Sequence, residues 1–282
     1  MEAIPQRFTV GQAVVTVFNA GDIQYDLAEN LIADEAILRD RYAAQVSAPL
    51  HVPMQCIHIQ TPQAVVMVDA ASSEIEADSP FRIAGYSPPA PLPEQMAAAG
   101  IDANAVESLV ITHAHWDHYN GLTVPAEGGG RAPICAQASV YMGRADWESA
   151  EMRGALAKPE TLQARTFGVV ARLGRLVLAE GRREIAPGIE IVPTPGETPG
   201  HVMLRVSSEG QTLYCVGDVY HHPIEAEQPG WAAPWADLES ICAIREALAV
   251  RAQAEGALII ATHIRGAGRL TQTKEGVRWV EA

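Results

Sequence analysis

The chain has 282 residues, of which 48% are apolar, and a formal net charge of −14. This composition is typical of a folded protein with a sizeable core and excludes a disordered chain. The acidic balance disfavours nucleic acid and membrane surfaces as partners, so we expect a small-molecule substrate.

The start of the chain and its cysteines favour a cytoplasmic location. Residues 1–21 lack a basic start followed by an apolar run, so we expect no signal peptide there. The apolar runs of the chain are too short to span a bilayer. The cysteines show no CxxC spacing, and we interpret them as free thiols: Cys56, Cys135, Cys215 and Cys242.

The first residues predict strands and one helix. We expect a strand over residues 7–18 and a helix over residues 33–46. Strands at residues 55–60 and 64–69 flank a Thr-Pro-Gln turn. Residues 1–50 form an N-terminal strand and arm in this interpretation, and the arm either covers a site or pairs two subunits, which leaves a homodimer open.

The middle of the chain predicts a buried strand between irregular segments. A proline-rich loop at residues 79–93 leads to a short helix at residues 93–100, which ends at a glycine. The continuous apolar run at residues 108–112 predicts a strand buried on both faces. We expect a further strand at residues 133–137 and a mostly helical segment over residues 139–166, with a proline break.

The second half repeats this alternation of strands and helices. Residues 237–253 predict an amphipathic helix, because apolar residues recur along one face and an Asp stands at its start. No linker divides the chain, so we expect a single domain over residues 1–282, with sheets inside and helices outside. The strands expected in this half cover residues 189–192, 202–206, 212–216, 257–261 and 277–280.

A cluster of potential metal ligands follows the strand at residues 108–112. His113, His115, Asp117 and His118 lie within six residues. His113 and His115 are two residues apart, so an extended backbone directs both to one side. Imidazole and carboxylate groups suit zinc and similar divalent ions. One histidine pair could arise by chance, but four ligands directly behind an apolar strand favour a metal site.

Three further candidates lie downstream, each at one end of an expected strand. His201 closes the segment Gly-Glu-Thr-Pro-Gly-His, Asp218 follows a glycine, and His263 follows a buried strand. Taken singly, each has an ordinary structural interpretation. Their order behind the first cluster is what indicates a shared site.

This order of motifs resembles the metallo-β-lactamase-fold hydrolases. An HxHxDH segment, a GxTxGH segment, an Asp and a final His follow one another over residues 113–263, as in that family. The resemblance implies an α/β fold, a four-layer αββα sandwich with the metals at one edge of its two sheets. It also implies His113, His115 and His201 as ligands of one metal, Asp117, His118 and His263 as ligands of the other, and Asp218 as the bridge.

Two divalent ions are therefore the expected cofactors, with zinc first and iron, manganese or cobalt as alternatives. A bridging carboxylate and hydroxide offset the repulsion between two neighbouring cations. The two metal ions also lower the pKa of the water that they share, so that it becomes a nucleophile near neutral pH. Besides binding metal, Asp117 is expected to carry a proton to the leaving group.

The segment after Asp218 resembles the branch that contains lactonases and organophosphate or aryl-ester hydrolases. An acid at the bridging position argues against β-lactam cleavage, because β-lactamases of this fold usually lack it. Acyl-homoserine lactone lactonases often carry a Tyr three residues after the bridge, where this chain has His221, with Tyr220 one residue earlier. We expect His221 to assist catalysis as a hydrogen-bond donor. Tyr220 is the alternative residue for this role, and His221 would then instead support a metal ligand.

The expected function is thus hydrolysis of a lactone or a related carboxylic ester by a metal-bound hydroxide. The alternatives are an iron-dependent oxidoreductase similar to sulfur dioxygenases, a thioester hydrolase on the same fold, and a metal-binding protein without catalysis. Trp231 and Trp235 lie in a proline-containing loop that either forms an apolar wall of the site or packs on the outer helices.

Overall fold

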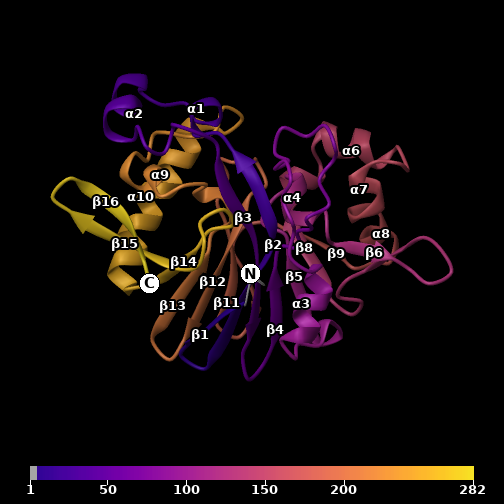
Figure 1. Cartoon of the computed structure of the whole chain (residues 1–282). Coiled ribbons are helices and arrows are strands. Elements are labelled where there is room, and N and C mark those ends of the chain that lie inside the picture. The colour runs from indigo at the N-terminus through magenta and orange to yellow at the C-terminus, as the bar shows by residue number, and fades with distance from the viewer. Residues whose placement is uncertain (1–4) are drawn as a thin grey trace.

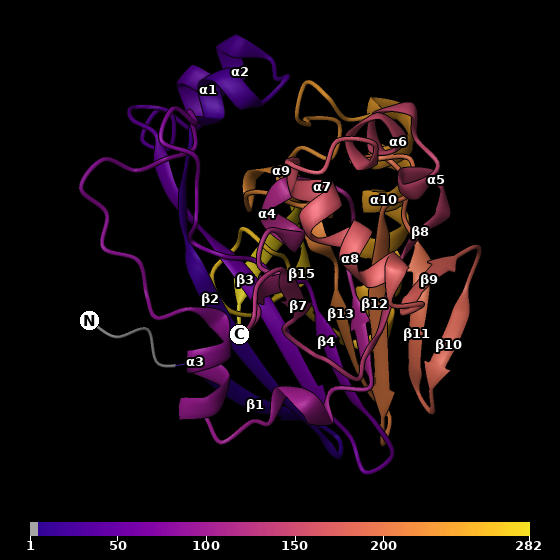
Figure 2. The ribbon, with the colours of Figure 1, turned by 90° about the vertical axis from the view of Figure 1, so that its right-hand side faces the viewer.

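The computed structural model describes residues 5–282, which form two seven-stranded sheets packed face to face, with helices on both outer faces (Figures 1 and 2). The predicted α/β sandwich is therefore confirmed, while residues 1–4 of the predicted domain lie outside the described residues. The first sheet contains, in spatial order, β1 (Gln6–Val10), β2 (Ala13–Tyr25), β3 (Leu50–Gln60), β4 (Val65–Val68), β5 (Ser108–Val110), β8 (Ser139–Gly143) and β9 (Leu176–Ala179).

The second sheet is formed by the C-terminal half of the chain, and a small two-stranded sheet lies apart from both. The small sheet pairs β6 (Thr123–Pro125) with β7 (Arg131–Pro133). The second sheet contains, in spatial order, β10 (Arg183–Ala186), β11 (Ile189–Pro193), β12 (Val202–Ser208), β13 (Gln211–Cys215), β14 (Leu258–Ile260), β15 (Gly268–Thr273) and β16 (Gly276–Glu281).

The helices cover the two sheets from opposite sides (Figure 1): α3 (Leu92–Ala98), α6 (Ala150–Leu156), α7 (Leu162–Arg165) and α8 (Phe167–Arg172) lie beside the first sheet, and α10 (Leu238–Glu255) lies beside the second. Within the described residues, no helix has the length and apolar character needed to cross a membrane. The remaining helices are α1 (Leu27–Asn30), α2 (Glu35–Arg41), α4 (Trp116–Tyr119), α5 (Arg144–Trp147) and α9 (Ile224–Glu227), with 3-10 turns η1 (Ala103–Ala105) and η2 (Gly217–Val219).

Apolar side chains fill three layers, one between the sheets and one on each outer face. Val15 and Val17 of β2 alternate inward and meet Leu204 and Val206 of β12 in the central layer. On the outer face of the second sheet, α10 buries Leu248 in the third layer. The thiols are free as expected, with Cys56, Cys135 and Cys215 buried and Cys242 partly exposed.

Several predicted elements differ from the structure. The strand expected over residues 7–18 is a hairpin, because Gly11 turns the chain with a φ of 56°. The helix expected over residues 33–46 is limited to α2. The strand expected at residues 133–137 ends at Pro133, and the segment from residue 139 begins as strand β8 rather than as a helix. Pairing of β8 between β5 and β9 overrides the local helical pattern there.

The second half matches the expected strands more closely. Strands β11, β12, β13, β14 and β16 lie where the pattern predicts them, whereas β9, β10 and β15 were not predicted. The helix α10 is confirmed, but the apolar stripe expected of it, which includes Val250 beside Ile241 and Leu248, is only partly buried. It buries Arg245 at 1% exposure, whereas Val250 is 73% exposed.

The strand directions determine where loops converge. Strands β4, β5, β8 and β9 run parallel, and β13 runs parallel to β14. The loops that follow β4, β5, β13 and β14 therefore leave the two sheets at one edge, which is where α/β proteins place their ligand sites.

Candidate metal centre

The first motif leaves β5 at this edge. After the buried strand, His113 precedes a bend at residues 114–115, in which His115 has extended dihedrals, and the one-turn helix α4 then presents Asp117 and His118. The Nε2 atom of His113 lies 2.9 Å from Nδ1 of His115, so both nitrogens face one point. His113, Asp117 and His118 are buried.

Asp218 lies at the centre of the cluster. Its Oδ2 atom is 3.2 Å from Nε2 of His118 and 3.3 Å from Nε2 of His263. The same nitrogen of His263 lies 3.2 Å from Oδ2 of Asp117. The second carboxylate oxygen of Asp218, Oδ1, is buried and has no hydrogen-bond partner within residues 5–282.

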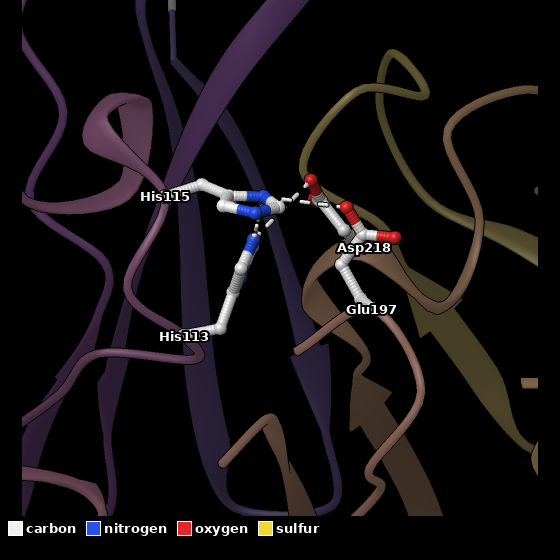
Figure 3. Close-up of side chains that lie close together, drawn as sticks. All are labelled: His113, His115, Glu197 and Asp218. Atoms are coloured by element: carbon white, nitrogen blue, oxygen red, sulfur yellow. Dashed lines mark hydrogen bonds and ion pairs between the residues drawn. The ribbon is translucent and has the colours of Figure 1, made fainter. Parts of the chain in front are cut away.

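The ligand atoms gather in two groups, within each of which they lie within 4.8 Å of one another. One group is His113, His115, Glu197 and Asp218, whose side chains converge in Figure 3. The other group is Asp117, His118 and His263.

His201 lies beside the first group and completes the set of seven residues expected from the sequence. Its ring centroid is 5.0 Å from that of His113. Its Nε2 atom is 3.2 Å from the backbone nitrogen of Asp218, from which it accepts a hydrogen bond. The structure therefore brings all seven expected residues to one place, and it adds Glu197, which the sequence reasoning missed although it belongs to the GxTxGH segment.

Residues around the cluster bind the Nδ1 atoms of three imidazoles, so that Nε2 of each ring points toward the centre of the cluster. Nδ1 of His118 lies 2.8 Å from Oδ2 of Asp69, and Nδ1 of His201 lies 2.8 Å from the hydroxyl of Thr194. Nδ1 of His263 donates to the carbonyl of Pro53 at 2.9 Å. Such partners fix the tautomer and direction of metal-binding histidines.

Asp69 was not recognised in the sequence. It follows β4 with a φ of 57°, a strained conformation for a residue other than glycine. Its carboxylate accepts hydrogen bonds from the backbone nitrogen and the hydroxyl of Thr112, at 2.8 and 3.0 Å. These bonds compensate the strain and tie the loop after β4 to the strand that leads into the first motif.

Asp146 was also missed, and it joins the two ligand-bearing loops. Its buried carboxylate accepts hydrogen bonds from the backbone of Ala114 at 3.0 Å and of Gly200 at 2.7 Å. It also accepts one from the hydroxyl of Thr198 at 2.8 Å. Ala114 separates the first two histidines, and Gly200 precedes His201, so one side chain sets the distance between both motifs.

The cluster fits divalent metal ions. Two ligand atoms on one tetrahedral zinc ion stand about 3.3 Å apart, since each bond is about 2.0–2.1 Å long. The nitrogen–oxygen distances around Asp218 are close to that value. The buried Oδ1 atom of Asp218 has no hydrogen-bond partner among the described residues, as is common for a carboxylate oxygen that serves as a metal ligand.

Electrostatics favours the ionised form of the acids. Burial alone would raise the pKa of Asp218, but His118, His263 and His221 hold it well below its usual range. Burial opposes ionisation of Glu197 as well, and His221 and His115 lower its pKa. The centre thus holds fixed negative charge in a buried place, which requires cations nearby.

His221 lies at the border of this cluster. Its Nε2 atom is 3.3 Å from Oδ2 of Asp218 and 3.4 Å from Oε1 of Glu197. Its ring stacks on Tyr25 with the centroids 5.5 Å apart. Tyr220, the alternative helper, is instead buried against Trp279 with its ring centroid 6.1 Å away, and it lies outside the cluster.

A cavity of about 220 Å³ opens onto the cluster. Aromatic rings dominate its walls, and no lysine or arginine of the described residues lines it. Trp235 belongs to the wall, whereas Trp231 packs in the core against Tyr42. The lining residues are Ile23, Tyr25, Phe81, His115, Trp116, Asp117, Asp218, His221, Trp235 and His263.

A larger cavity of about 480 Å³ also touches Trp116. It is lined by acidic and basic side chains, including Glu74, Arg131 and Arg165, and by none of the candidate ligands. Of these two cavities, the smaller one has candidate ligands in its wall.

Comparison with known proteins agrees with this geometry. Residues 55–241 match the family model described as the metallo-beta-lactamase superfamily. An N-acyl homoserine lactonase of Bacillus cereus is 23% identical over 58% of this chain and 62% of its own length. One from Bacillus thuringiensis is 24% identical over 61% of this chain and 66% of its own length. The match thus spans less than two thirds of the length of these relatives.

Solved structures share the fold over nearly the whole chain. The hydrolase AbOPH of the beta lactamase superfamily has a TM-score of 0.79 at 16% identity and covers 100% of this chain and 98% of its own. AidC, a dizinc quorum-quenching lactonase, has a TM-score of 0.76 at 19% identity and covers 99% of this chain and 97% of its own. With its family motifs gathered at one edge of the sandwich, the chain belongs to the metallo-beta-lactamase superfamily.

Proposed function

We propose that the protein is a hydrolase with two divalent metal ions, zinc first, that opens a lactone or cleaves a related carboxylic ester. The observation that carries this proposal is the pair of ligand groups that meet at Asp218 on the floor of an aromatic cavity. A bound pair of ions would polarise the ester carbonyl and lower the pKa of a shared water. The ligands would be the seven predicted residues.

Two side chains have positions suited to proton handling. Asp117 lines the cavity, and its Oδ2 atom lies 3.2 Å from Nε2 of His263, so this carboxylate is placed to carry a proton to the leaving oxygen. Nε2 of His221 borders the same cavity, where it can donate a hydrogen bond to an oxygen that gains negative charge.

The cavity favours a compact, neutral substrate. Its volume of about 220 Å³ is below the range of roughly 300–1,000 Å³ that is usual for ligand sites. Its aromatic walls suit a short acyl chain or an aryl group. The similarity to N-acyl homoserine lactonases supports a lactone as the first candidate.

The test is proton release in a weakly buffered solution. The metal-loaded protein receives acyl-homoserine lactones, simple γ- and δ-lactones, aryl esters, thioesters and a phosphotriester, and a chelated sample serves as the control. We expect chelator-sensitive turnover that is fastest for lactones with short acyl groups. Oxygen consumption without ester turnover would instead favour the iron-dependent oxidoreductase.

The substitution Asp218→Ala tests the same proposal by removing a ligand instead of the metal ions. Because Asp218 touches both ligand groups, we expect turnover to fall by more than about 100-fold, beyond the usual loss for a partner of a metal ligand. Asp40→Ala removes an acid from the exposed face of α2 and should leave turnover unchanged. A correctly folded Asp218→Ala variant with full activity would refute the bridging assignment.

A further inference from the structure

Glu197 is a buried acid that the seven-residue ligand pattern does not include. It lies in the loop between β11 and β12, and its side chain is 1% exposed. Its Oε1 atom accepts a hydrogen bond from the indole of Trp235. The same oxygen lies 3.4 Å from Nε2 of His221 and 3.3 Å from Nδ1 of His115.

The distance to His115 has the length expected for two ligands of one ion. Ligand atoms on a tetrahedral zinc ion stand about 3.3 Å apart. The nitrogen of His115 that faces Glu197 is the one that also faces Nε2 of His113. These two histidines, Glu197 and Asp218 therefore direct one atom each toward a common point (Figure 3).

We propose that Glu197 is a ligand of the metal held by His113 and His115, so that the centre contains three carboxylates, from Asp117, Glu197 and Asp218. This inference rests on the metal centre of the proposed function. Glu197 would join His113, His115 and His201 on this metal, beside the bridging Asp218, as an oxygen ligand additional to the seven expected residues.

A third carboxylate changes which ions the centre prefers. Two divalent ions carry four positive charges, and three carboxylates among neutral imidazoles offset three of them. Oxygen ligands suit manganese and similar hard ions, whereas imidazole suits zinc and iron. Glu197 therefore strengthens binding of the ion held by His113 and His115, and it improves binding of manganese relative to zinc at that position.

The competing explanation is that Glu197 only accepts hydrogen bonds from Trp235 and His221. Glu197→Gln separates the two roles, because the amide oxygen still accepts these bonds but is a far weaker ligand than a carboxylate. Glu255→Gln is the matched control. It removes the same charge at a half-buried carboxylate that pairs with Arg205 outside the centre.

The experiment measures metal binding rather than turnover. Apo protein is titrated with Zn²⁺, Mn²⁺ and Co²⁺ against a competing chelator, and the bound ions are counted by mass spectrometry. In Glu197→Gln we expect one of the two ions to bind at least 100-fold more weakly, with a larger loss for Mn²⁺ than for Zn²⁺. The d–d absorption bands of the Co²⁺ protein should shift, and Glu255→Gln should match the wild type.

Unchanged affinities together with an unchanged Co²⁺ spectrum in Glu197→Gln would overturn the assignment. If this variant does not fold, Glu197→Asp, which withdraws the oxygens by one methylene, replaces it and should show the same loss for one ion. Turnover is recorded separately on the wild type. A wild type that binds metal through Glu197 but cleaves no ester would contradict the proposed function and leave this inference standing.

Discussion

His221 combines a fixed ring with free access to the cavity. Its ring is stacked between Tyr25 and His263, with centroids 5.5 and 5.7 Å away. Glu225 holds its backbone by accepting the N–H of His221 at 2.5 Å. A ring fixed in this way can present Nε2 to a substrate oxygen without losing conformational entropy at that moment.

We therefore predict that His221→Phe lowers kcat by about 100-fold, as loss of an oxyanion donor does. Phenylalanine preserves the stacking but removes both ring nitrogens. His222→Phe is the control, because His222 does not line the cavity. Steady-state kinetics with metal analysis tests this prediction, and a loss of bound metal in His221→Phe would show that His221 binds or supports the metal instead of acting only as a donor.

Asp146 lies outside the ligand cluster and connects two of the loops that carry the ligands. It connects the loop after β5 to the loop before β12, and three hydrogen bonds converge on its carboxylate. The loops supply the histidines of one group, so their separation determines how well those nitrogens fit one ion.

For Asp146→Ala we predict metal affinity lower by about 10- to 100-fold, the usual cost of losing a partner that orients ligands. Chelator competition measures the affinity. Asp146→Asn should recover part of it, because the amide oxygen can still accept one of the three bonds. Equal affinities in all three proteins would mean that the ligand loops hold their places without Asp146.

A buried ion pair fixes the segment that carries His221. Arg245 of α10 donates to Oε1 of Glu225 at 2.6 Å, and both side chains are 1% exposed. Arg245 also donates to the carbonyls of Val219 at 2.6 Å and of Pro229 at 3.3 Å, on either side of α9. Removing one partner from such a pair leaves the other charge buried and uncompensated.

We expect Glu225→Gln to lower the free energy of unfolding by about 3–5 kcal/mol at neutral pH. Burial would raise the pKa of Glu225, but Arg245 and His221 lower it from 4.5 to about 2. Since the folded-state pKa is the lower one, this stabilisation is present above pH 4.5 and is lost as the pH falls toward 2.

Denaturant unfolding at several pH values tests this linkage. The difference between the wild type and Glu225→Gln should shrink between about pH 4.5 and pH 2. A difference that stays constant over this range would contradict the assigned pKa. The half-exposed Arg205–Glu255 pair is the comparison, and its removal should cost less than about 1 kcal/mol.

The motifs were easier to predict than the elements around them. The HxHxDH motif places four residues of metal-binding types within six positions. Directly after a buried strand, such a group of residues has few explanations other than a metal site. Asp69, Asp146 and Glu197 are single acids whose roles arise from contacts across the chain, and a single acid leaves no pattern in sequence. Strand β8 was mistaken for a helix because its buried environment between β5 and β9 comes from pairing, not from periodicity.

At the scale of the whole molecule, the metal centre joins the two halves of the sandwich. His113, Asp117 and His118 come from the edge of the first sheet, whereas Asp218 and His263 follow strands of the second. The buried carboxylates of Asp117 and Asp218 at this junction lie against the imidazoles of His118, His221 and His263. Metal binding should therefore stabilise the packing of one sheet against the other.

Removing the metals should lower the unfolding temperature. An ion present at about 100 times its Kd adds about 2.7 kcal/mol to the free energy of unfolding. For a domain of this size, each kcal/mol raises Tm by about 2–4 °C, so one ion should contribute about 5–11 °C. Calorimetry with and without chelator measures the difference, which should shrink in Asp218→Ala. Metal analysis should find two ions in the wild type and none in its chelated form. If these two samples nevertheless unfold at the same temperature, the centre does not couple the two sheets.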